Sequence, residues 1–209
     1  MNKTDRLDRR QVVSSLLAAR GDAIVIGGLG ASTYDIAAAG DHERNFYLWG
    51  AMGGAVMIGL GVALAQPKLP VVVITGDGEM LMGMGSLATV GLQQPRNLTI
   101  VVLDNECYGE TGGQASHTAG GTDLVGVAKA CGIAEVSSMT TMAEVEAFKG
   151  SLQDVSTGPR FACVKIDGAN LERTLSNPRR CVHHEPDPRG ARIPPDLAVI
   201  RSGALQQGS

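Results

Sequence analysis

The chain has 209 residues, which predicts one domain or slightly more. Hydrophobic residues make up 44% and charged residues 19%, a composition typical of a globular protein that excludes disorder over the whole chain. An aromatic content of 3% and a formal net charge of −3 argue against a surface that binds nucleic acid.

The cysteines and the apolar runs indicate the cellular environment. Cys107, Cys131, Cys163 and Cys181 form no CxxC pair and have no zinc or iron–sulfur spacing, so we expect reduced thiols and a cytoplasmic protein. The longest apolar run, residues 51–65, is too short to span a bilayer, and the charged N-terminus lacks the apolar core of a signal peptide. We therefore expect no association with membranes.

The first half of the chain alternates between helical and extended patterns. Apolar side chains recur at helical spacing over residues 7–17, which predicts a helix. Residues 23–27 are a short apolar run that ends in glycines and predict a buried strand, and residues 45–49 predict a second strand. Residues 51–65 predict a buried helix, and the β-branched run at residues 70–75 predicts another strand.

The alternation continues through the second half. Residues 80–93 predict a helix that stops before a proline, and residues 98–103 predict a strand. A long polar loop, rich in glycine, covers residues 105–121, and loops of this length are usually functional or disordered. Residues 123–131 and 133–136 then predict a helix and a short strand.

The last predicted helix begins at a capping box formed by Thr141 and Glu144 and extends to about residue 155, and residues 161–166 predict the closing strand. This alternation predicts an α/β fold with a doubly wound, mostly parallel sheet flanked by helices over residues 1–170. Residues 171–209 are rich in proline and predict an extended or partly disordered tail.

Glycines follow the first predicted strand in the sequence GGLGAS. The stretch from Gly28 lacks the third glycine of a dinucleotide fingerprint, because Thr33 stands there, and the chain contains no P-loop. Either the backbone N–H groups of this turn bind a phosphate at the start of a helix, or the segment is a simple strand-to-helix turn.

Polar residues follow two other predicted strands. Asp77 comes directly after residues 70–75, and Asn105 follows residues 98–103. If the two strands are neighbours in a parallel sheet, both side chains lie at the edge where ligands bind in such folds. One carboxylate, one amide oxygen and a main-chain carbonyl from the following loop suit Mg²⁺ or Ca²⁺, and a diphosphate could complete the coordination. The alternative is two ordinary turns.

The spacing of these residues resembles a known motif. Gly76, Asp77 and Gly78, followed by 26 residues and then Asn105, resemble the thiamine diphosphate motif. The segment Gly50–Gly53 matches the GxMG segment of that family, and Tyr108–Gln114 is similar to the YGxTGGQ stretch of sulfopyruvate and phosphonopyruvate decarboxylases. The resemblance covers about residues 25–166 and implies the diphosphate-binding domain of a 2-oxo acid decarboxylase.

The resemblance implies a role for each matching residue. Asp77, Asn105 and the main-chain oxygen of Cys107 would hold Mg²⁺. Met52 would support the bent cofactor, and the Gly50 carbonyl would accept a hydrogen bond from its aminopyrimidine. The remaining residues expected to contact the cofactor are Gly30, Ala31, Ser32, Gly76, Gly78, Glu79, Tyr108 and Gly109.

Two residues depart from the family pattern. Asp104 stands where the wider family often has asparagine. The carboxylate of Glu79 would be repelled by a diphosphate unless it turns away or pairs with another group. His117 and Gln114, in the long loop, are candidate catalytic residues that would touch the substrate, and the alternative for His117 is a solvent-exposed loop histidine.

The family places an activating glutamate on a separate pyrimidine-binding domain. Only residues 1–22 precede the first predicted strand, so we expect a partner α subunit to supply that glutamate in a hetero-oligomer. We thus expect the β subunit of an enzyme that uses thiamine diphosphate and Mg²⁺ to convert a 2-oxo acid, such as sulfopyruvate or phosphonopyruvate, to an aldehyde and CO₂. The alternatives are a carboligase subunit similar to acetolactate synthase, a 2-oxo acid oxidoreductase subunit, and a non-catalytic regulatory subunit that binds a diphosphate.

Overall fold

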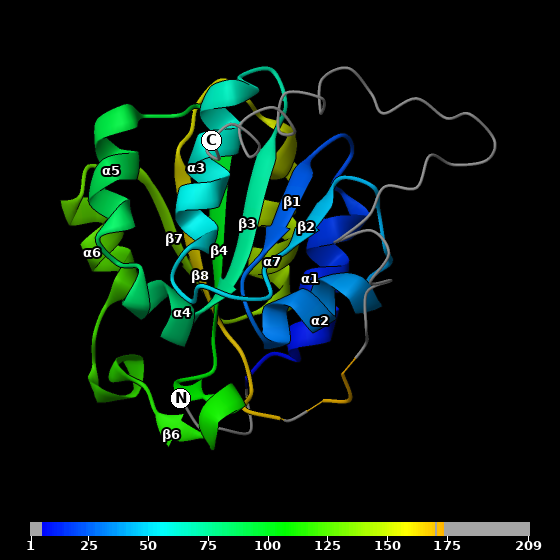
Figure 1. Ribbon diagram of the computed structural model, residues 1–209, viewed down its shortest axis with the longest axis vertical. Coiled ribbons are helices and arrows are strands. Elements are labelled where there is room, and N and C mark those ends of the chain that lie inside the picture. The colour runs from blue at the N-terminus through cyan, green and yellow to red at the C-terminus, as the bar shows by residue number, and fades with distance from the viewer. Residues whose placement is uncertain (1–5, 170, 174–209) are drawn as a thin grey trace, which may run out of the picture. The chain divides into compact units, whose positions relative to one another are not determined.

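A parallel sheet of six strands forms the centre of the computed structural model, which describes residues 6–169 and 171–173 (Figure 1). In chain order the strands of this sheet are β1 (Ile24–Gly27), β2 (Asn45–Tyr47), β3 (Val71–Gly76), β4 (Leu98–Asp104), β7 (Glu135–Met139) and β8 (Arg160–Lys165). Their order across the sheet is β2-β1-β3-β4-β8-β7, and every neighbouring pair is parallel. The predicted doubly wound α/β fold is therefore confirmed.

Helices cover both faces of the sheet (Figure 1). They are α1 (Arg9–Ala18), α2 (Ala31–Ala38), α3 (Ala55–Ala65), α4 (Asp77–Met82), α5 (Ser86–Gln93), α6 (Leu124–Ala130) and α7 (Met142–Lys149). Helices α1, α2 and α7 pack on one face, and α3, α5 and α6 pack on the other. Within the described residues, no helix has the length and the apolar character that a membrane span requires.

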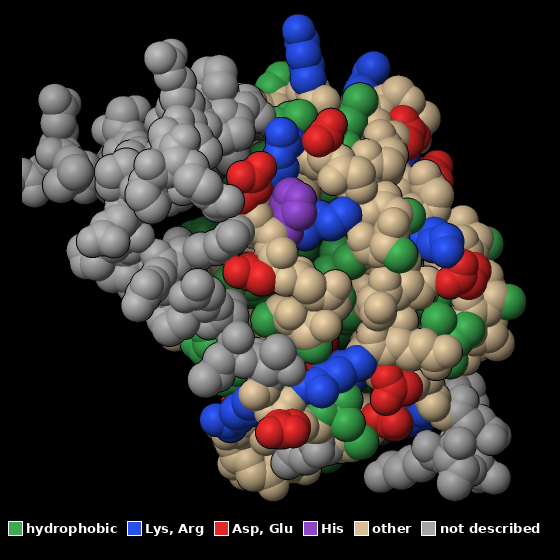
Figure 2. Space-filling model, turned by 90° about the vertical axis from the view of Figure 1, so that its right-hand side faces the viewer, with side chains coloured by type: hydrophobic (Ala, Val, Ile, Leu, Met, Phe, Trp, Pro, Cys, Tyr) green, Lys and Arg blue, Asp and Glu red, His purple; other side chains and the backbone are tan. Residues whose placement is uncertain are grey.

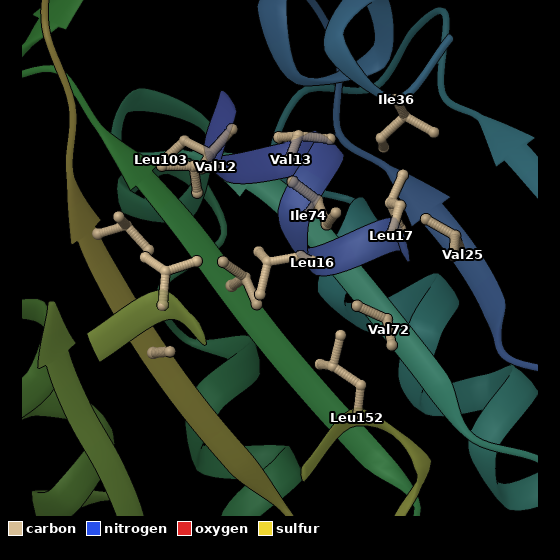
Figure 3. Close-up of a cluster of buried hydrophobic side chains, with 14 of the residues drawn as sticks. Val12, Val13, Leu16, Leu17, Val25, Ile36, Val72, Ile74, Leu103 and Leu152 are labelled. Atoms are coloured by element: carbon tan, nitrogen blue, oxygen red, sulfur yellow. The ribbon is translucent and has the colours of Figure 1, made fainter. Parts of the chain in front are cut away.

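The core consists of two apolar layers, one on each face of the sheet, because successive strand side chains point to opposite faces. In β3, Val72 and Ile74 contribute to the layer beneath α1, whereas Val71 and Val73 contribute to the layer beneath α3 and α5. Figure 3 shows the first of these layers, in which Val12, Val13, Leu16 and Leu17 of α1 lie against the strands. The helical spacing of these residues in the sequence thus reflects one buried face of α1.

Helix α3 begins at Ala55, four residues later than predicted. Ala51 and Gly53 have φ angles of 56° and 90°, which a right-handed helix does not allow. The segment that contains Met52 is therefore an irregular loop in front of the helix.

The predicted helix over residues 80–93 is divided into α4 and α5. A Cβ atom on Gly83 would lie 2.2 Å from the carbonyl oxygen of Gly53, so the two backbones approach more closely than any other residue would allow at position 83. The break between α4 and α5 thus packs closely against Gly53, the residue that follows Met52.

The loop over residues 105–121 is more ordered than the sequence predicts. It contains the antiparallel strands β5 (Cys107–Tyr108) and β6 (Gln114–Ala115) and two 3-10 helices, Gly109–Thr111 and His117–Gly120. The loop lies at the end of the sheet where β3 and β4 terminate (Figure 1).

The C-terminal part of the fold differs from the prediction in detail. Strand β7 lies two to three residues later than predicted, and β8 lies between β4 and β7, so β7 is the edge strand. The capping box of Thr141 and Glu144 is confirmed, but α7 ends at Lys149 and continues as the 3-10 helix Gly150–Gln153.

The chain divides into a unit over residues 1–176 and a unit over residues 177–209, and the second lies outside the described residues. The predicted tail therefore falls almost wholly outside them, and a domain boundary at residue 170 stays a prediction. On the face of the first unit that Figure 2 presents, the described basic and acidic side chains are interspersed.

Candidate functional site

The ends of β3 and β4 place several polar side chains together. The two strands are neighbours, as the sequence predicts, and Gly76 pairs with Leu103 in their register. Asp77 directly follows β3 and Asp104 is the last residue of β4, and the Thr118 hydroxyl oxygen lies within hydrogen-bond distance of both carboxylates, at 3.2 Å and 2.8 Å. The acid and the amide that follow these strands therefore belong to one region.

A cleft of about 480 Å³ opens at these strand ends. Of the residues singled out in the sequence, those lining it are Ala31, Ser32, Met52, Gly76, Asp77, Gly78, Glu79, Asn105, Cys107, Tyr108 and Gly109. Gly30, Gly50, Gln114 and His117 are not among the lining residues. Gly50, Gln114 and His117 are exposed, which for His117 agrees with the alternative of an exposed loop histidine. The Nδ1 atom of His117 lies 3.3 Å from the hydroxyl of Tyr108, a residue that lines the cleft.

Asp77 is a buried carboxylate that two hydroxyl groups orient. It is 2% exposed, and Ser116 and Thr118 both donate to its Oδ2 atom. Burial raises the pKa of Asp77, the Ser116 hydrogen bond opposes this rise, and the nearby Asp104 charge adds to it. A cation bound to this carboxylate would relieve the cost of its burial.

Asp104 is neutralised within the fold. Lys165 of β8, which lies opposite Asp104 in the register, donates to its Oδ2 atom at 2.6 Å and to Glu106 at 3.0 Å. Burial lowers the pKa of Lys165, but the hydrogen bonds and charges of these two carboxylates outweigh burial and raise it overall. The departure from asparagine at position 104 is thus compensated by a lysine on the neighbouring strand.

Glu79 turns its carboxyl group into the protein. The Thr75 hydroxyl donates to its Oε2 atom at 2.8 Å, and a Cβ atom on Gly28 would lie 1.9 Å from that oxygen. Burial raises the pKa of Glu79, while the Thr75 hydroxyl and the backbone N–H groups of Ala55, Gly53 and Leu29 act in the opposite direction. The carboxyl group therefore lies between the turn after β1 and the end of β3, and its Oε1 atom is buried without a hydrogen-bond partner among the described residues.

Two helices begin at this cleft without a side-chain cap. The N-cap of α2 is Gly30, with a φ of 91°, and the N-cap of α4 is Gly76. Neither receives a side-chain hydrogen bond, so the N–H groups of the first turns lack the usual side-chain acceptor. Uncapped N–H groups that border a cleft are suited to binding the oxygens of a phosphate.

The donors around Asp77 suit a hard cation. Among residues 6–169 and 171–173, no three His, Cys, Asp or Glu side chains gather closely enough to hold a metal ion. A metal site here would therefore combine the Asp77 carboxylate with neutral oxygens, such as the Asn105 amide oxygen and the Cys107 carbonyl. The Asn105 Oδ1 atom already accepts from the Cys107 N–H at 3.1 Å, and this hydrogen bond orients the side chain. Such oxygens suit Mg²⁺, so the residues present fit a magnesium diphosphate.

Sequence reasoning missed several residues of the site. Ser116 and Thr118 orient Asp77 across about 40 positions of the chain, and no local pattern distinguishes them from other loop hydroxyls. Arg9 and Asp35 also line the cleft, although both lie on helices that cover the sheet. Their place in the site depends on the packing of α1 against α2.

Comparisons with known proteins identify the family of the chain. Residues 28–166 match the family model of the thiamine pyrophosphate enzyme C-terminal TPP binding domain. The chain is 40% identical to sulfopyruvate decarboxylase subunit beta of Methanocaldococcus jannaschii, over 63% of this chain and 69% of that protein. It is 45% identical to phosphonopyruvate decarboxylase of Streptomyces viridochromogenes, over 72% of this chain and 37% of that protein, so it spans little more than a third of that relative.

A solved structure shows the same fold. It is an enzyme from Mycobacterium smegmatis described as thiamin diphosphate-dependent, with a TM-score of 0.65 and 20% identity, over 78% of this chain and 32% of that one. The match to the family model and the 40% identity to the β subunit identify the family, whereas the similarity to the solved structure shows only the fold. The chain belongs to the thiamine pyrophosphate enzyme family and contains its C-terminal TPP-binding domain.

Proposed function

We propose that the chain is the diphosphate-binding β subunit of a decarboxylase that uses thiamine diphosphate and Mg²⁺. The observation that carries this proposal is the pairing of β3 with β4, which brings Asp77 and Asn105 to one cleft bordered by two uncapped helices. In this proposal Asp77, Asn105 and the Cys107 carbonyl hold the magnesium ion. In this proposal the cofactor-binding domain extends over residues 1–170.

The N–H groups at the starts of α2 and α4 bind the phosphate oxygens in this proposal, through Gly30, Ala31, Ser32, Gly78 and Glu79. The Glu79 carboxyl group faces Thr75 and Gly28, so it does not oppose the diphosphate directly. Gly76, Tyr108 and Gly109 complete the contacts with the cofactor.

Met52 and the Gly50 carbonyl orient the cofactor, and Gln114 and His117 contact the substrate. The Tyr108 hydroxyl, which lies within hydrogen-bond distance of His117, links that residue to the cleft. Thiamine diphosphate, when bound, supplies an electron sink for the loss of CO₂ from a 2-oxo acid.

The substrate and the partner follow from the relatives. Both named decarboxylases act on 2-oxo acids with an acidic tail, and the relative named as subunit beta implies a complex with a second subunit. We therefore assign a 2-oxo acid with a sulfonate or phosphonate tail as substrate, and an α subunit that supplies the activating glutamate as partner. We also place the complex in the cytoplasm, which the free thiols of Cys131 and Cys163 support.

The experiment is a decarboxylation assay of the complex co-purified with its α subunit. We expect sulfopyruvate or phosphonopyruvate to yield CO₂ and an aldehyde only when thiamine diphosphate and Mg²⁺ are both present. Asp77→Ala should abolish this activity, whereas Asp22→Asn, at an exposed carboxylate, should not change it. A ligated product would indicate carboligation, and cofactor binding without turnover would indicate a regulatory subunit.

A further inference from the structure

Arg9 is a buried cation at the wall of the cleft. It is the first residue of α1 and is 6% exposed, and it lines the cleft together with Asp35, Leu103 and Ile166. Buried arginine side chains are rare unless other groups satisfy them. The contacts of this guanidinium therefore indicate whether it has a structural role alone.

The contacts of Arg9 within the described residues are incomplete. Its Nε atom lies 3.0 Å from the Asp35 Oδ2 atom, but the angle does not make a hydrogen bond, and both atoms are buried without a hydrogen-bond partner. No described residue makes a hydrogen bond to its Nη groups. The Arg9 guanidinium thus has a nearby counter-charge and a set of unused N–H donors.

Asp35 does not neutralise Arg9 alone. The Arg10 Nε atom lies 3.3 Å from the Asp35 Oδ1 atom, so one buried carboxylate faces two guanidinium groups. Burial raises the pKa of Asp35, and the charges of Arg9 and Arg10 oppose that rise. The three side chains together carry a net positive charge when Asp35 is ionised. Of the two arginines, Arg9 lines the cleft and Arg10 does not.

The other cation of the described cleft wall already has partners. Arg173 lies 3.3 Å from the Glu110 carboxylate and stacks over the Tyr34 ring at 5.6 Å, and its side chain is mostly exposed. Arg9 is therefore the buried cation whose donors are available to a molecule in the cleft.

We propose that Arg9 binds an anionic group in this cleft, with its two Nη groups donating to two oxygens of a phosphate, phosphonate or sulfonate. A guanidinium matches such oxygens because its N–H groups form a planar fork. The source of the anion is either the cofactor diphosphate or the acidic tail of the substrate. Only the identity of the anion rests on the proposed function.

The test measures binding directly by calorimetry, with the full chain in complex with its α subunit. The probes are inorganic phosphate, inorganic pyrophosphate with Mg²⁺, and phosphonoacetate, an unreactive acid that carries a phosphonate. Arg9→Met removes the charge but keeps most of the stem. Arg10→Met is the matched control, because it removes the same charge from the same helix and the same carboxylate without lining the cleft.

We expect Arg9→Met to weaken at least one probe by about tenfold or more, the loss expected when hydrogen bonds to a charged group are removed. Arg10→Met should change each affinity by about twofold or less, as expected for a charge outside the site. Weaker pyrophosphate binding alone assigns Arg9 to the cofactor, and weaker phosphonoacetate binding alone assigns it to the substrate tail.

A double variant separates the loss of a contact with the anion from the effect of the uncompensated Asp35 charge. Arg9→Met leaves Asp35 with one cation fewer, whereas Arg9→Met with Asp35→Asn removes both charges. If Arg9 binds the anion, the double variant should bind as weakly as Arg9→Met. Recovery of affinity in the double variant, or unchanged binding of all three probes in Arg9→Met, would overturn the inference. Failure of wild-type thiamine diphosphate binding would instead refute the proposed function, and the phosphate measurement would still test Arg9.

Discussion

Replacement of Gly83 by alanine tests how the cleft is held in shape. Gly83 ends α4 with a φ of −103°, a conformation that alanine adopts without strain, so the effect comes from contact alone. The new Cβ atom would lie 2.2 Å from the Gly53 carbonyl oxygen and 2.9 Å from its carbonyl carbon. The Gly53 backbone, next to Met52, must therefore move.

The size of this movement follows from the contact. Separation of the Cβ and oxygen atoms from 2.2 Å to about 3.0 Å requires a displacement of about 0.8 Å. Overpacking of this kind costs roughly 1–3 kcal/mol. We expect Gly83→Ala to lower the free energy of unfolding by about 2 kcal/mol, and to weaken thiamine diphosphate binding because Met52 moves.

The measurement is urea unfolding followed by circular dichroism, together with calorimetric titration of the complex with the cofactor. Gly85→Ala is the matched control, because Gly85 has a φ of −60° and its Cβ atom would meet nothing within 4 Å. That variant should be neutral or slightly more stable. Equal stability and equal cofactor affinity in the two variants would show that the contact between Gly83 and Gly53 does not hold the cleft in shape.

Three further predictions concern the buried charges. Lys165→Met should lower the free energy of unfolding by about 2 kcal/mol in urea titrations, because the Asp104 carboxylate loses its cation; an unchanged midpoint would contradict this. Burial raises the pKa of Asp77, so the folded cofactor-free protein binds the Asp77 proton more tightly than the unfolded chain does. The contribution of Asp77 to the free energy of unfolding therefore decreases as the pH rises above about 3.8. Asp77→Asn should therefore flatten the decline of stability with rising pH in that range, and an identical pH profile would disprove the assignment. Glu79→Gln should cost about 1–3 kcal/mol in thermal or urea unfolding, since an amide NH₂ group replaces one oxygen of a buried carboxyl group; wild-type stability would contradict this.

The strands and the strand-end residues could be predicted from the sequence for a physical reason. Strands buried on both faces appear as uninterrupted apolar runs, such as residues 71–75, and parallel strands end at the same edge of the sheet. Two adjacent runs followed by Asp77 and Asn105 therefore indicate a shared region from the order of the residues alone.

The features that sequence reasoning missed depend on contacts between distant segments. The break at Gly83 arises from the Gly53 backbone, which local helical periodicity does not reveal. The hydroxyl of Ser116 reaches Asp77 through the hairpin of the long loop, and Arg9 resembles an ordinary charged residue at the start of a helix. These contacts are set by tertiary packing.

The position of the metal ion would show whether Asp77 and Asn105 bind it together. Crystals of the complex with its α subunit, grown with thiamine diphosphate and with Mn²⁺ in place of Mg²⁺, would locate the cation by its anomalous scattering. We expect one strong peak bonded to the Asp77 carboxylate, the Asn105 amide oxygen and the Cys107 carbonyl. A cation bound elsewhere in the chain, or a cofactor bound without contact to Asp77, would contradict this expectation.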